Sequence, residues 1–275
     1  MSGVEHFSDA AAINPYMNSS AAIDLARAKQ EHDSIRAALE AAGVSVEQVD
    51  APAGCQDGVY TANWALCRDK KAVLASLPNM RAGEEPYAEA LLLERGFEVI
   101  RPPKRFSGQG DALPCGNLLF AGSQYRTDPE VHAFVAEHLG FEVISLQTVP
   151  VLDISGRPVI NAVTGWPDSF FYDIDLALSV LRPDLIAWCP DAFTPASQEK
   201  IRATDLDKIE VSFEEATNNF ACNLVSTGET VVMSATAPKF RSAIESKGLK
   251  TITPEITELA KGGGYIRCTT LTLDN

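Results

Sequence analysis

The seven-residue stretch GFEVIRP, residues 96–102, returns almost unchanged as GFEVISL, residues 140–146. A segment with helical character precedes each copy, at residues 85–95 and 129–139, and we predict Asp128 as the N-cap of the second. Three further segments, residues 21–49, 194–213 and 237–254, repeat the order of helix and then strand. Five such units predict repeated α/β supersecondary modules, arranged around an axis or along a solenoid.

A polar loop and then an apolar strand follow each unit, in QDGVYTANWAL, SGQGDALPCGNLLFAG, GWPDSFFYDIDLALSV, FACNLVSTGETVVMSA and GGGYIRCTTLTL. Five units that close a ring would bring these loops together. An ordinary α/β sheet would scatter them, and spacing alone does not decide between the two arrangements. Because no linker or low-complexity tract divides the chain, we expect one domain over residues 1–275.

Polar residues collected from the five loops form a set with one thiol among carboxylates and amides, namely Asp57, Asn63, Asp111, Asp168, Asp173, Asp175, Asn223 and Cys268. Carboxylates bind a guanidinium or amidinium cation through paired, charge-assisted hydrogen bonds, which leave its central carbon open to a thiolate. Taken singly, each aspartate is equally typical of a turn or a helix cap, and Cys268 of a small buried residue on a terminal strand.

Composition narrows the function classes. A formal charge of −14 disfavours nucleic acid and anionic membrane surfaces as partners and favours a cationic small molecule. The apolar runs are too short to span a bilayer and the first residues lack a signal-peptide pattern, so we expect a cytoplasmic protein. Six cysteines without a CxxC pair predict reduced thiols and no zinc site, and no cofactor is predicted.

Seven motifs occur in an order that is typical of one family: INPYM, QDGVYTAN, GQGDAL, GSQYRTD, FYDIDLALSVL, ACNLVSTG and the terminal GGGYIRCTTLTL. Over nearly its whole length the chain resembles the amidinotransferase superfamily, the pentein fold of dimethylarginine dimethylaminohydrolases, arginine deiminases, arginine dihydrolases and glycine amidinotransferases. The resemblance implies a five-bladed, pseudo-symmetric α/β propeller built from ββαβ modules, with the loops at its axis. Members of this family are often dimers, so a homodimer is an expectation of the same resemblance.

The resemblance also implies roles for individual residues. Cys268 stands in the place of the nucleophile, which forms a covalent thiouronium-type intermediate that water hydrolyses. Asp111 matches a catalytic-site aspartate, and Asn63 lies where members use Asp or Asn against the guanidino group. Asp57 would support that loop, and Arg126 matches an arginine that holds a substrate carboxylate. General statistics fit Arg126 equally well as a solvated residue ahead of a helix. Asn223, from the fourth loop, completes the predicted substrate-binding set.

Two positions depart from the family pattern. Asp173 in FYDID replaces the histidine that acts as general acid and base in a motif resembling FYHLD, and Ser107 stands where many relatives have a glutamate. The sequence has four histidines, His6, His32, His132 and His138. We expect His32 to be a packed core residue and His132 and His138 to lie on the surface of a helix.

Three functions follow as alternatives. The first is a cysteine-dependent hydrolase of a C–N bond in a guanidine- or amidine-like small molecule of the dimethylarginine or arginine type, with Cys268, Asp173 and Asp111 as catalytic residues. The second is a nitrohydrolase on a 2-nitroimidazole-type heteroaromatic, whose nitrite leaves as an anion without needing a proton. The third is a protein that binds a guanidino compound without turning it over. Cys268 argues against the third alternative and the missing histidine argues for it.

Overall fold

The structure is a computed structural model that describes residues 1–17 and 22–273. Within these ranges the chain forms four separate three-stranded sheets. Their strands, in sets of three, are β1 Ala65–Arg68, β2 Lys71–Leu74 and β3 Glu98–Ile100; β4 Ala112–Cys115, β5 Leu118–Ser123 and β6 Glu142–Gln147; β7 Leu178–Arg182, β8 Leu185–Trp188 and β9 Asp207–Glu210; and β10 Val225–Ser226, β11 Thr230–Val232 and β12 Lys250–Ile252.

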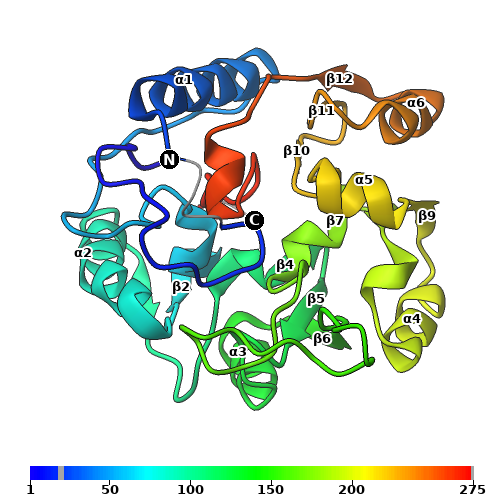
Figure 1. The fold of residues 1–275 in the computed structure, drawn as a ribbon, viewed down its shortest axis with the longest axis horizontal. Helices are drawn as coiled ribbons and strands as arrows, with labels where there is room; N and C mark the ends of the chain where they lie inside the picture. The colour runs from blue at the N-terminus through cyan, green and yellow to red at the C-terminus, as the bar shows by residue number, and fades with distance from the viewer. Residues whose placement is uncertain (18–21, 274–275) are drawn as a thin grey trace.

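The helices lie mostly at the periphery. They are α1 Leu25–Ala41, α2 Glu85–Glu94, α3 Val131–Leu139, α4 Pro195–Arg202, α5 Phe213–Asn218 and α6 Pro238–Ser246. Figure 1 shows α1, α2, α3, α4 and α6 around the outside of a ring of strands and loops, with the C-terminal segment toward its middle. The predicted α/β fold of repeated units is therefore confirmed.

Each sheet has the same pairing. The first strand pairs antiparallel with the second, and the second pairs parallel with the third after a helical crossover. In the second sheet the β4–β5 hairpin turns at Gly116, which has a φ of 59°. Helix α3 ends at Gly140, whose φ of 70° places it in the left-handed region that favours glycine. The two GFEVI repeats thus mark the start of the third strand in two units.

The beginning of α3 differs from the prediction. The N-cap residue is Glu130, and the predicted cap role of Asp128 is wrong. The Asp128 carboxylate instead accepts hydrogen bonds from the guanidinium of Arg105, with 2.6 Å between Arg105 Nη2 and Asp128 Oδ1. A strong charge-assisted partner therefore holds the side chain away from the helix end.

The fifth unit joins both ends of the chain. Helix α1 begins at Leu25 rather than near Ala21, which lies outside the described residues. The expected strand at residues 44–49 is reduced to one parallel bridge between Ser2 and Val49, where Val49 N–H donates to the Met1 carbonyl at 2.9 Å. The fifth unit is therefore present as a helix and a short connection, without a three-stranded sheet in the described residues.

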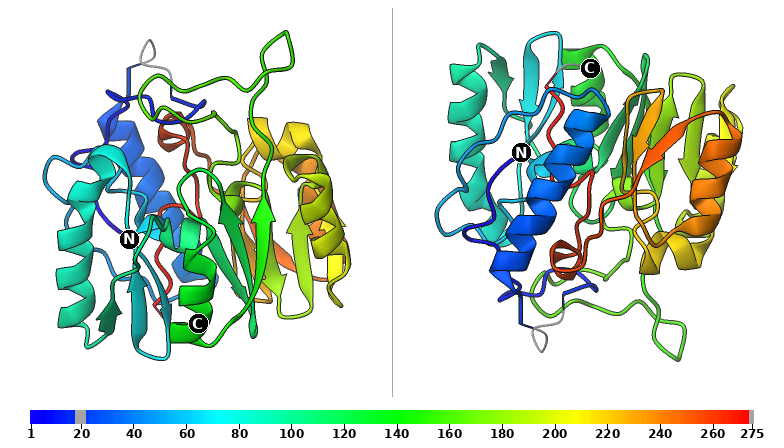
Figure 2. Two further views of the ribbon diagram at one scale, coloured as in Figure 1. Left: turned by 90° about the horizontal axis from the view of Figure 1, so that it is seen from below. Right: turned by 90° about the horizontal axis from the view of Figure 1, so that it is seen from above.

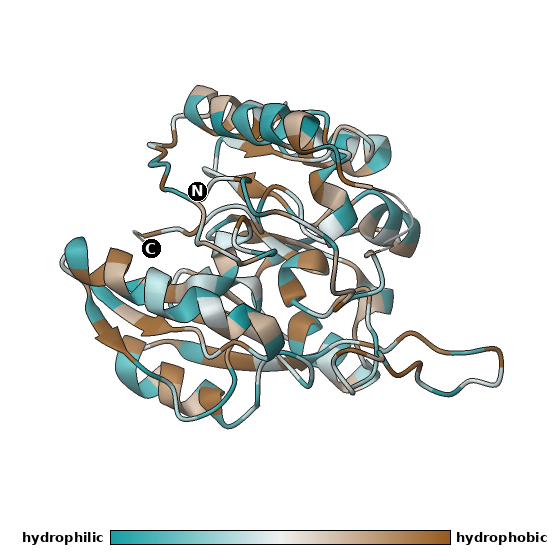
Figure 3. Cartoon of the chain, turned by 60° about the vertical axis from the view of Figure 1, so that its left-hand side comes forward, coloured by the Kyte–Doolittle hydropathy of each residue, from teal (hydrophilic) through white to brown (hydrophobic). Residues whose placement is uncertain are grey.

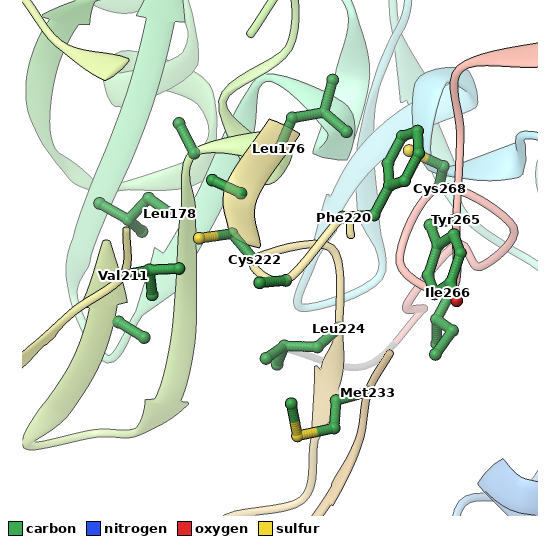
Figure 4. Packing of buried hydrophobic residues seen from close by; sticks show 14 of the residues in the cluster. Leu176, Leu178, Val211, Phe220, Cys222, Leu224, Met233, Tyr265, Ile266 and Cys268 are labelled. Atoms are coloured by element: carbon green, nitrogen blue, oxygen red, sulfur yellow. The ribbon is translucent and has the colours of Figure 1, made fainter. Parts of the chain in front are cut away.

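The largest hydrophobic cluster runs through the third and fourth sheets and reaches the C-terminal segment, and Phe220, Tyr265 and Cys268 belong to it (Figure 4). Residues 149–168, between β6 and the FYDID segment, form an arm that projects beyond the sheets (Figure 2). Leu152 and Ile154 are exposed on this arm, which Figure 3 shows as a long loop away from the body. Along the described residues we find no helix with both the length and the apolar character needed to cross a bilayer.

Candidate active site

Cys268 lies in a turn, not on the predicted strand. The preceding 3₁₀ helix η6, Leu259–Gly262, ends at Gly263 with a φ of 88°, and Thr269 N–H then donates to the Tyr265 carbonyl at 3.3 Å. A side chain at Gly264 is excluded because its Cβ would lie 2.3 Å from the ring of Tyr60. The glycine run therefore packs this segment closely against its neighbours and presents the thiol from a compact turn.

A carboxylate from α1 holds the start of this segment. Glu31 accepts hydrogen bonds from the backbone N–H groups of Thr257, Glu258 and Leu259, each at 2.8–3.1 Å. Glu31 is buried, with a relative exposure of 5%. These N–H groups precede or begin η6 and have no intrahelical acceptor, so the carboxylate satisfies them in the manner of a helix cap.

Two side chains contact the buried thiol. Asn223 Nδ2 donates to Cys268 Sγ at 3.1 Å, while Asn223 Oδ1 accepts from the Cys268 backbone N–H at 3.1 Å. On another side, the thiol donates to Asp175 Oδ2 at 3.3 Å. Burial and the nearby Asp175 carboxylate raise the pKa of Cys268 above its usual value. The sulfur therefore has one fixed hydrogen-bond donor and one adjacent acceptor for its proton.

Asp175 is buried on the 3₁₀ helix η4, Ile174–Leu176. Burial and the neighbouring Asp173 carboxylate raise the pKa of Asp175 to about 7. Its second oxygen, Oδ1, is buried and has no hydrogen-bond partner among the described residues. One oxygen of this carboxylate therefore contacts the thiol and the other is unpaired.

Asp173 does not contact the thiol through a hydrogen bond in the described structure. Its Oδ2 accepts from Asn63 Nδ2 at 2.8 Å and from Arg126 Nη1 at 3.2 Å, and its Oδ1 is also unpartnered. The sequence analysis placed the family histidine's role on Asp173. The residue that reaches Cys268 is instead Asp175, two positions further along, and a catalytic role for Asp173 stays a prediction.

Asn63 is held at the centre of a buried network. Its Nδ2 also donates to Ser107 Oγ at 2.8 Å, and its Oδ1 accepts from Arg81 Nη1 at 2.7 Å. Ser107, which replaces a glutamate of many relatives, thus bonds a protein amide. With both ends of its amide engaged, Asn63 orients neighbouring groups, and its predicted contact with a substrate stays a prediction.

Arg81 and Glu84 are functional neighbours that the sequence analysis missed. Arg81 donates to Glu84 at 2.7 and 2.8 Å, and both side chains are fully buried. Arg81 Nη2 also donates to the backbone carbonyl of Asp57 at 3.3 Å. Burial raises the pKa of the Asp57 carboxyl to about 6, although Arg81 opposes this shift. Arg81 and Glu84 lie on the short 3₁₀ helix η2, Asn79–Glu84, which has no apolar periodicity, so no sequence pattern marked them.

The side chain of Asp111 contacts the FYDID segment, residues 171–175. Its Oδ1 accepts the backbone N–H of Ile174 at 3.1 Å, which fixes the start of η4 between the two aspartates. Burial and Asp173 raise the pKa of Asp111 well above the usual range of a carboxyl group. Gly122 allows this approach, because a Cβ there would lie 1.8 Å from Asp111 Oδ1. Asp111 thus positions the segment that carries Asp173 and Asp175.

Aromatic rings border the site. The Arg126 guanidinium lies 4.1 Å from the centroid of the Tyr172 ring and is buried, which excludes the solvated alternative. Tyr16, from the INPYM motif, lies 4.6 Å from the Phe220 ring, centroid to centroid, and Phe220 stacks on Tyr265 at 5.2 Å. Aromatic rings and buried charged groups therefore lie close together in this part of the molecule.

The four histidines form no hydrogen bond with Cys268 or with the three aspartates at residues 111, 173 and 175 in the described structure. His32 is buried on α1, as expected, but its Nε2 has no partner there. His132 is buried rather than on the surface, and its Nε2 bonds the Gly122 carbonyl at 2.8 Å. Asp168 is also away from the thiol, since its carboxylate accepts from Asn161 on the arm.

Comparisons with known proteins agree with this geometry. The family model described as N,N dimethylarginine dimethylhydrolase, eukaryotic, matches residues 5–274. The N(G),N(G)-dimethylarginine dimethylaminohydrolase of Mycobacterium tuberculosis is 33% identical over 267 residues, covering 96% of this chain and 82% of that protein. The bifunctional arginine dihydrolase/ornithine cyclodeaminase ArgZ of Synechocystis is 28% identical, and this chain spans 36% of its length.

The fold matches a solved structure of ArgZ's N-terminal domain bound to product, with a TM-score of 0.87 and 28% identity. That match covers 100% of this chain and 97% of the solved chain. A variant of the same domain is described as covalently bonded to a reaction intermediate. The pentein resemblance drawn from the seven motifs is therefore confirmed at the level of family and fold.

Proposed function

This chain belongs to the N,N dimethylarginine dimethylhydrolase family, whose members hydrolyse C–N bonds in linear amidines, and we propose that it hydrolyses a guanidino C–N bond of an arginine-type substrate with Cys268 as nucleophile. The observation that carries the proposal is the position of the thiol between Asn223 Nδ2 and Asp175 Oδ2, at 3.1 and 3.3 Å. A hydrogen-bond donor and a proton acceptor that both contact the sulfur are what an activated nucleophile needs.

The surrounding groups suit the substrate class. Unpaired buried carboxylate oxygens on Asp173 and Asp175 are acceptors for the N–H groups of a planar amidine. Arg126, with one side-chain hydrogen bond to Asp173, is our proposed partner for a substrate carboxylate. The covalent intermediate described for the ArgZ domain supports a thiouronium-type intermediate on Cys268.

A second candidate is favoured by one observation. Among the described residues none of the four histidines forms a hydrogen bond with the thiol or its neighbouring aspartates, so no histidine takes the general-acid role that the family pattern gives to the position of Asp173. A leaving group that departs as a stable anion needs no proton at that point. A 2-nitroimidazole-type heteroaromatic that loses nitrite meets this condition, and a site with two buried arginines, Arg81 and Arg126, beside its aspartates suits an uncharged substrate.

The test is a product screen on the purified chain. Arginine, methylated arginines, agmatine and 2-nitroimidazole are incubated separately, and ammonia, amines, urea-type products and nitrite are measured. An amine or ammonia from an arginine-type compound supports the first function, and nitrite supports the second. Saturable binding without product, unchanged in Cys268→Ala, would establish the non-catalytic alternative. Cys115→Ala is the matched control, because Cys115 lies on β4 with its thiol on backbone carbonyls of residues 182 and 183.

A further inference from the structure

We infer that Asp175, rather than Asp173, is the catalytic proton carrier of this site, exchanging a proton directly with the sulfur of Cys268. The inference rests on the proposed thiol chemistry, and it assigns the two aspartates of FYDID different tasks. Asp175 would accept the thiol proton and later deliver it, while Asp173 would hold Asn63 and Arg126 in place.

Direct contact separates the two residues. Asp175 Oδ2 lies 3.3 Å from Cys268 Sγ, within reach for a thiol donor, while Asp173 Oδ2 is already occupied by the amide of Asn63 and the guanidinium of Arg126. Two donors other than the thiol therefore engage this oxygen of Asp173, and of the two aspartates only Asp175 has a hydrogen bond to the sulfur in the described structure.

The surroundings of Asp175 favour a group that exists in both protonation states. Several side chains interact with the Asp175 carboxyl group, either electrostatically or through hydrogen bonds. They are Asp173, Asp111, Arg267, Asn223, Cys268, Cys222 and Tyr16. Burial and Asp173 disfavour its charge, whereas Arg267 and the hydrogen bonds from Cys268 and Asn223 favour it, so the pKa of Asp175 is about 7. General acid–base catalysis works best with such a value near neutral pH.

The local backbone keeps the two roles apart. Ile174, between the two aspartates, has its N–H fixed on Asp111 Oδ1 at 3.1 Å. This bond holds the chain so that Asp173 bonds Asn63 and Arg126 while Asp175 faces the nucleophile turn. Asp111 is thus a positioning residue for this division.

The reaction balances with Asp175 as the only carrier. The thiol gives its proton to Asp175 Oδ2 as sulfur bonds to the central carbon, and the C=N π electrons move to nitrogen. The tetrahedral adduct collapses, the C–N bond breaks, and the leaving amine takes the proton from Asp175. Water then attacks the thiouronium carbon, giving one proton to Asp175. The C–S bond breaks as the C=O bond forms, the sulfur recovers that proton from Asp175, and the remaining hydroxyl proton passes to the released amine, leaving a urea-type product and a protonated amine.

Alkylation of Cys268 tests the assignment without any substrate. Iodoacetamide forms an S–C bond as iodide leaves and the thiol proton passes to Asp175. Modification of the Cys268 peptide is followed by mass spectrometry across pH for the wild type, Asp175→Asn and Asp173→Asn. We expect a rise in rate with an apparent pKa near 7 in the wild type, and at least a tenfold slower reaction at neutral pH in Asp175→Asn.

Asp173→Asn separates the two assignments. In this variant the alkylation rate should still rise with pH, but with a lower apparent pKa than in the wild type. Removing a neighbouring negative charge favours ionisation of Asp175. A wild-type rate and titration in Asp175→Asn, or loss of the titration in Asp173→Asn alone, would overturn the inference. Because the product screen and the alkylation profile are independent, an inactive chain with the expected profile refutes the proposed function and keeps the assignment.

A measurement on the wild type covers the case in which Asp175→Asn does not fold. Infrared difference spectra between about pH 6 and pH 8 should show a protonated carboxyl band lost with rising pH. The band should shift in frequency when Cys268 is replaced in Cys268→Ala, because the sulfur is a hydrogen-bond partner of that carboxyl. An unchanged band in Cys268→Ala would contradict the direct exchange.

Discussion

Arg126 and Asp173 form a buried ion pair, with 3.2 Å between Nη1 and Oδ2 and side-chain exposures of 5% and 1%. Asp173 stands where the family pattern places a histidine, so an ion pair takes the place of an imidazole ring. In the proposed mechanism, proton transfer to and from the thiol then depends on Asp175.

Removing one partner of this ion pair should lower the free energy of unfolding. We expect Arg126→Met to lower the free energy of unfolding by about 3–5 kcal/mol, because it leaves the Asp173 carboxylate buried without its counter-ion. Urea denaturation measures the change. Arg157→Met is the control, since Arg157 pairs with Asp153 on the exposed arm at 80% side-chain exposure and should cost under about 0.5 kcal/mol. Equal losses in the two variants would contradict the buried-pair account.

Gly122→Ala should displace the Asp111 side chain and so disturb the candidate site. The added Cβ would lie 1.8 Å from Asp111 Oδ1 and 2.5 Å from Ile174 Cγ2, so Asp111 must move off the Ile174 N–H. We expect a loss of about 1–3 kcal/mol in unfolding free energy, typical of overpacking, and a slower alkylation of Cys268. Gly83→Ala, whose Cβ would lie 3.4 Å from Cys55 Sγ, should change neither by much.

Asn223→Ala should weaken the nucleophile. Its amide donates to the sulfur and accepts the Cys268 backbone N–H, so the variant removes the one side-chain donor that stabilises a thiolate here in the described structure. A hydrogen bond to a charged group contributes about 1.5–3 kcal/mol, which corresponds to alkylation slower by roughly tenfold to a hundredfold. Asn117→Ala, at an exposed hairpin turn, serves as the comparison. An unchanged rate in Asn223→Ala would remove this residue from thiol activation.

His32 should make the fold sensitive to acid. Burial lowers the pKa of His32 to about 4, whereas the unfolded chain takes up the same proton near pH 6.5. Between these values the unfolded state binds more protons, so the stability supplied by the neutral ring is present above pH 6.5 and is lost as pH falls toward 4. The integrated effect is about 3 kcal/mol at most. In His32→Leu, chemical denaturation at about pH 7 and pH 4.5 should show a smaller difference than in the wild type. An undiminished difference would exclude His32 as its source.

The sequence predicted most of the architecture, because helices and strands with clear periodicity and a terminating glycine depend on local chemistry. The helix and strand on either side of Gly96, and those on either side of Gly140, are examples. Tertiary contacts overrode local preference in the nucleophile segment. Its β-branched residues favour a strand, but the Cys268 backbone N–H bonds Asn223 and the Thr269 N–H bonds the Tyr265 carbonyl, which produces a turn.

The residues of the candidate site could be predicted from the sequence, but the contacts among them could not. Cys268, Asp111, Asp173, Asp175 and Asn223 all stand in loops that the repeat pattern singled out. Which aspartate meets the sulfur depends on a rotation of the backbone within three residues, set by the bond from Ile174 to Asp111. No spacing rule specifies such a rotation, and the buried cations that distinguish the two carboxylates come from separate loops.

The Glu31 carboxylate on α1 joins residues that are 226 to 228 positions apart when it accepts the three N–H groups ahead of the nucleophile turn. Bonds of this sequence separation form only after the chain has closed a loop of nearly its full length, and such closure is slow compared with local helix formation. The thiol's working geometry is therefore a late product of folding. We expect a partly folded chain, which lacks these bonds, to be alkylated at its six cysteines without preference for Cys268.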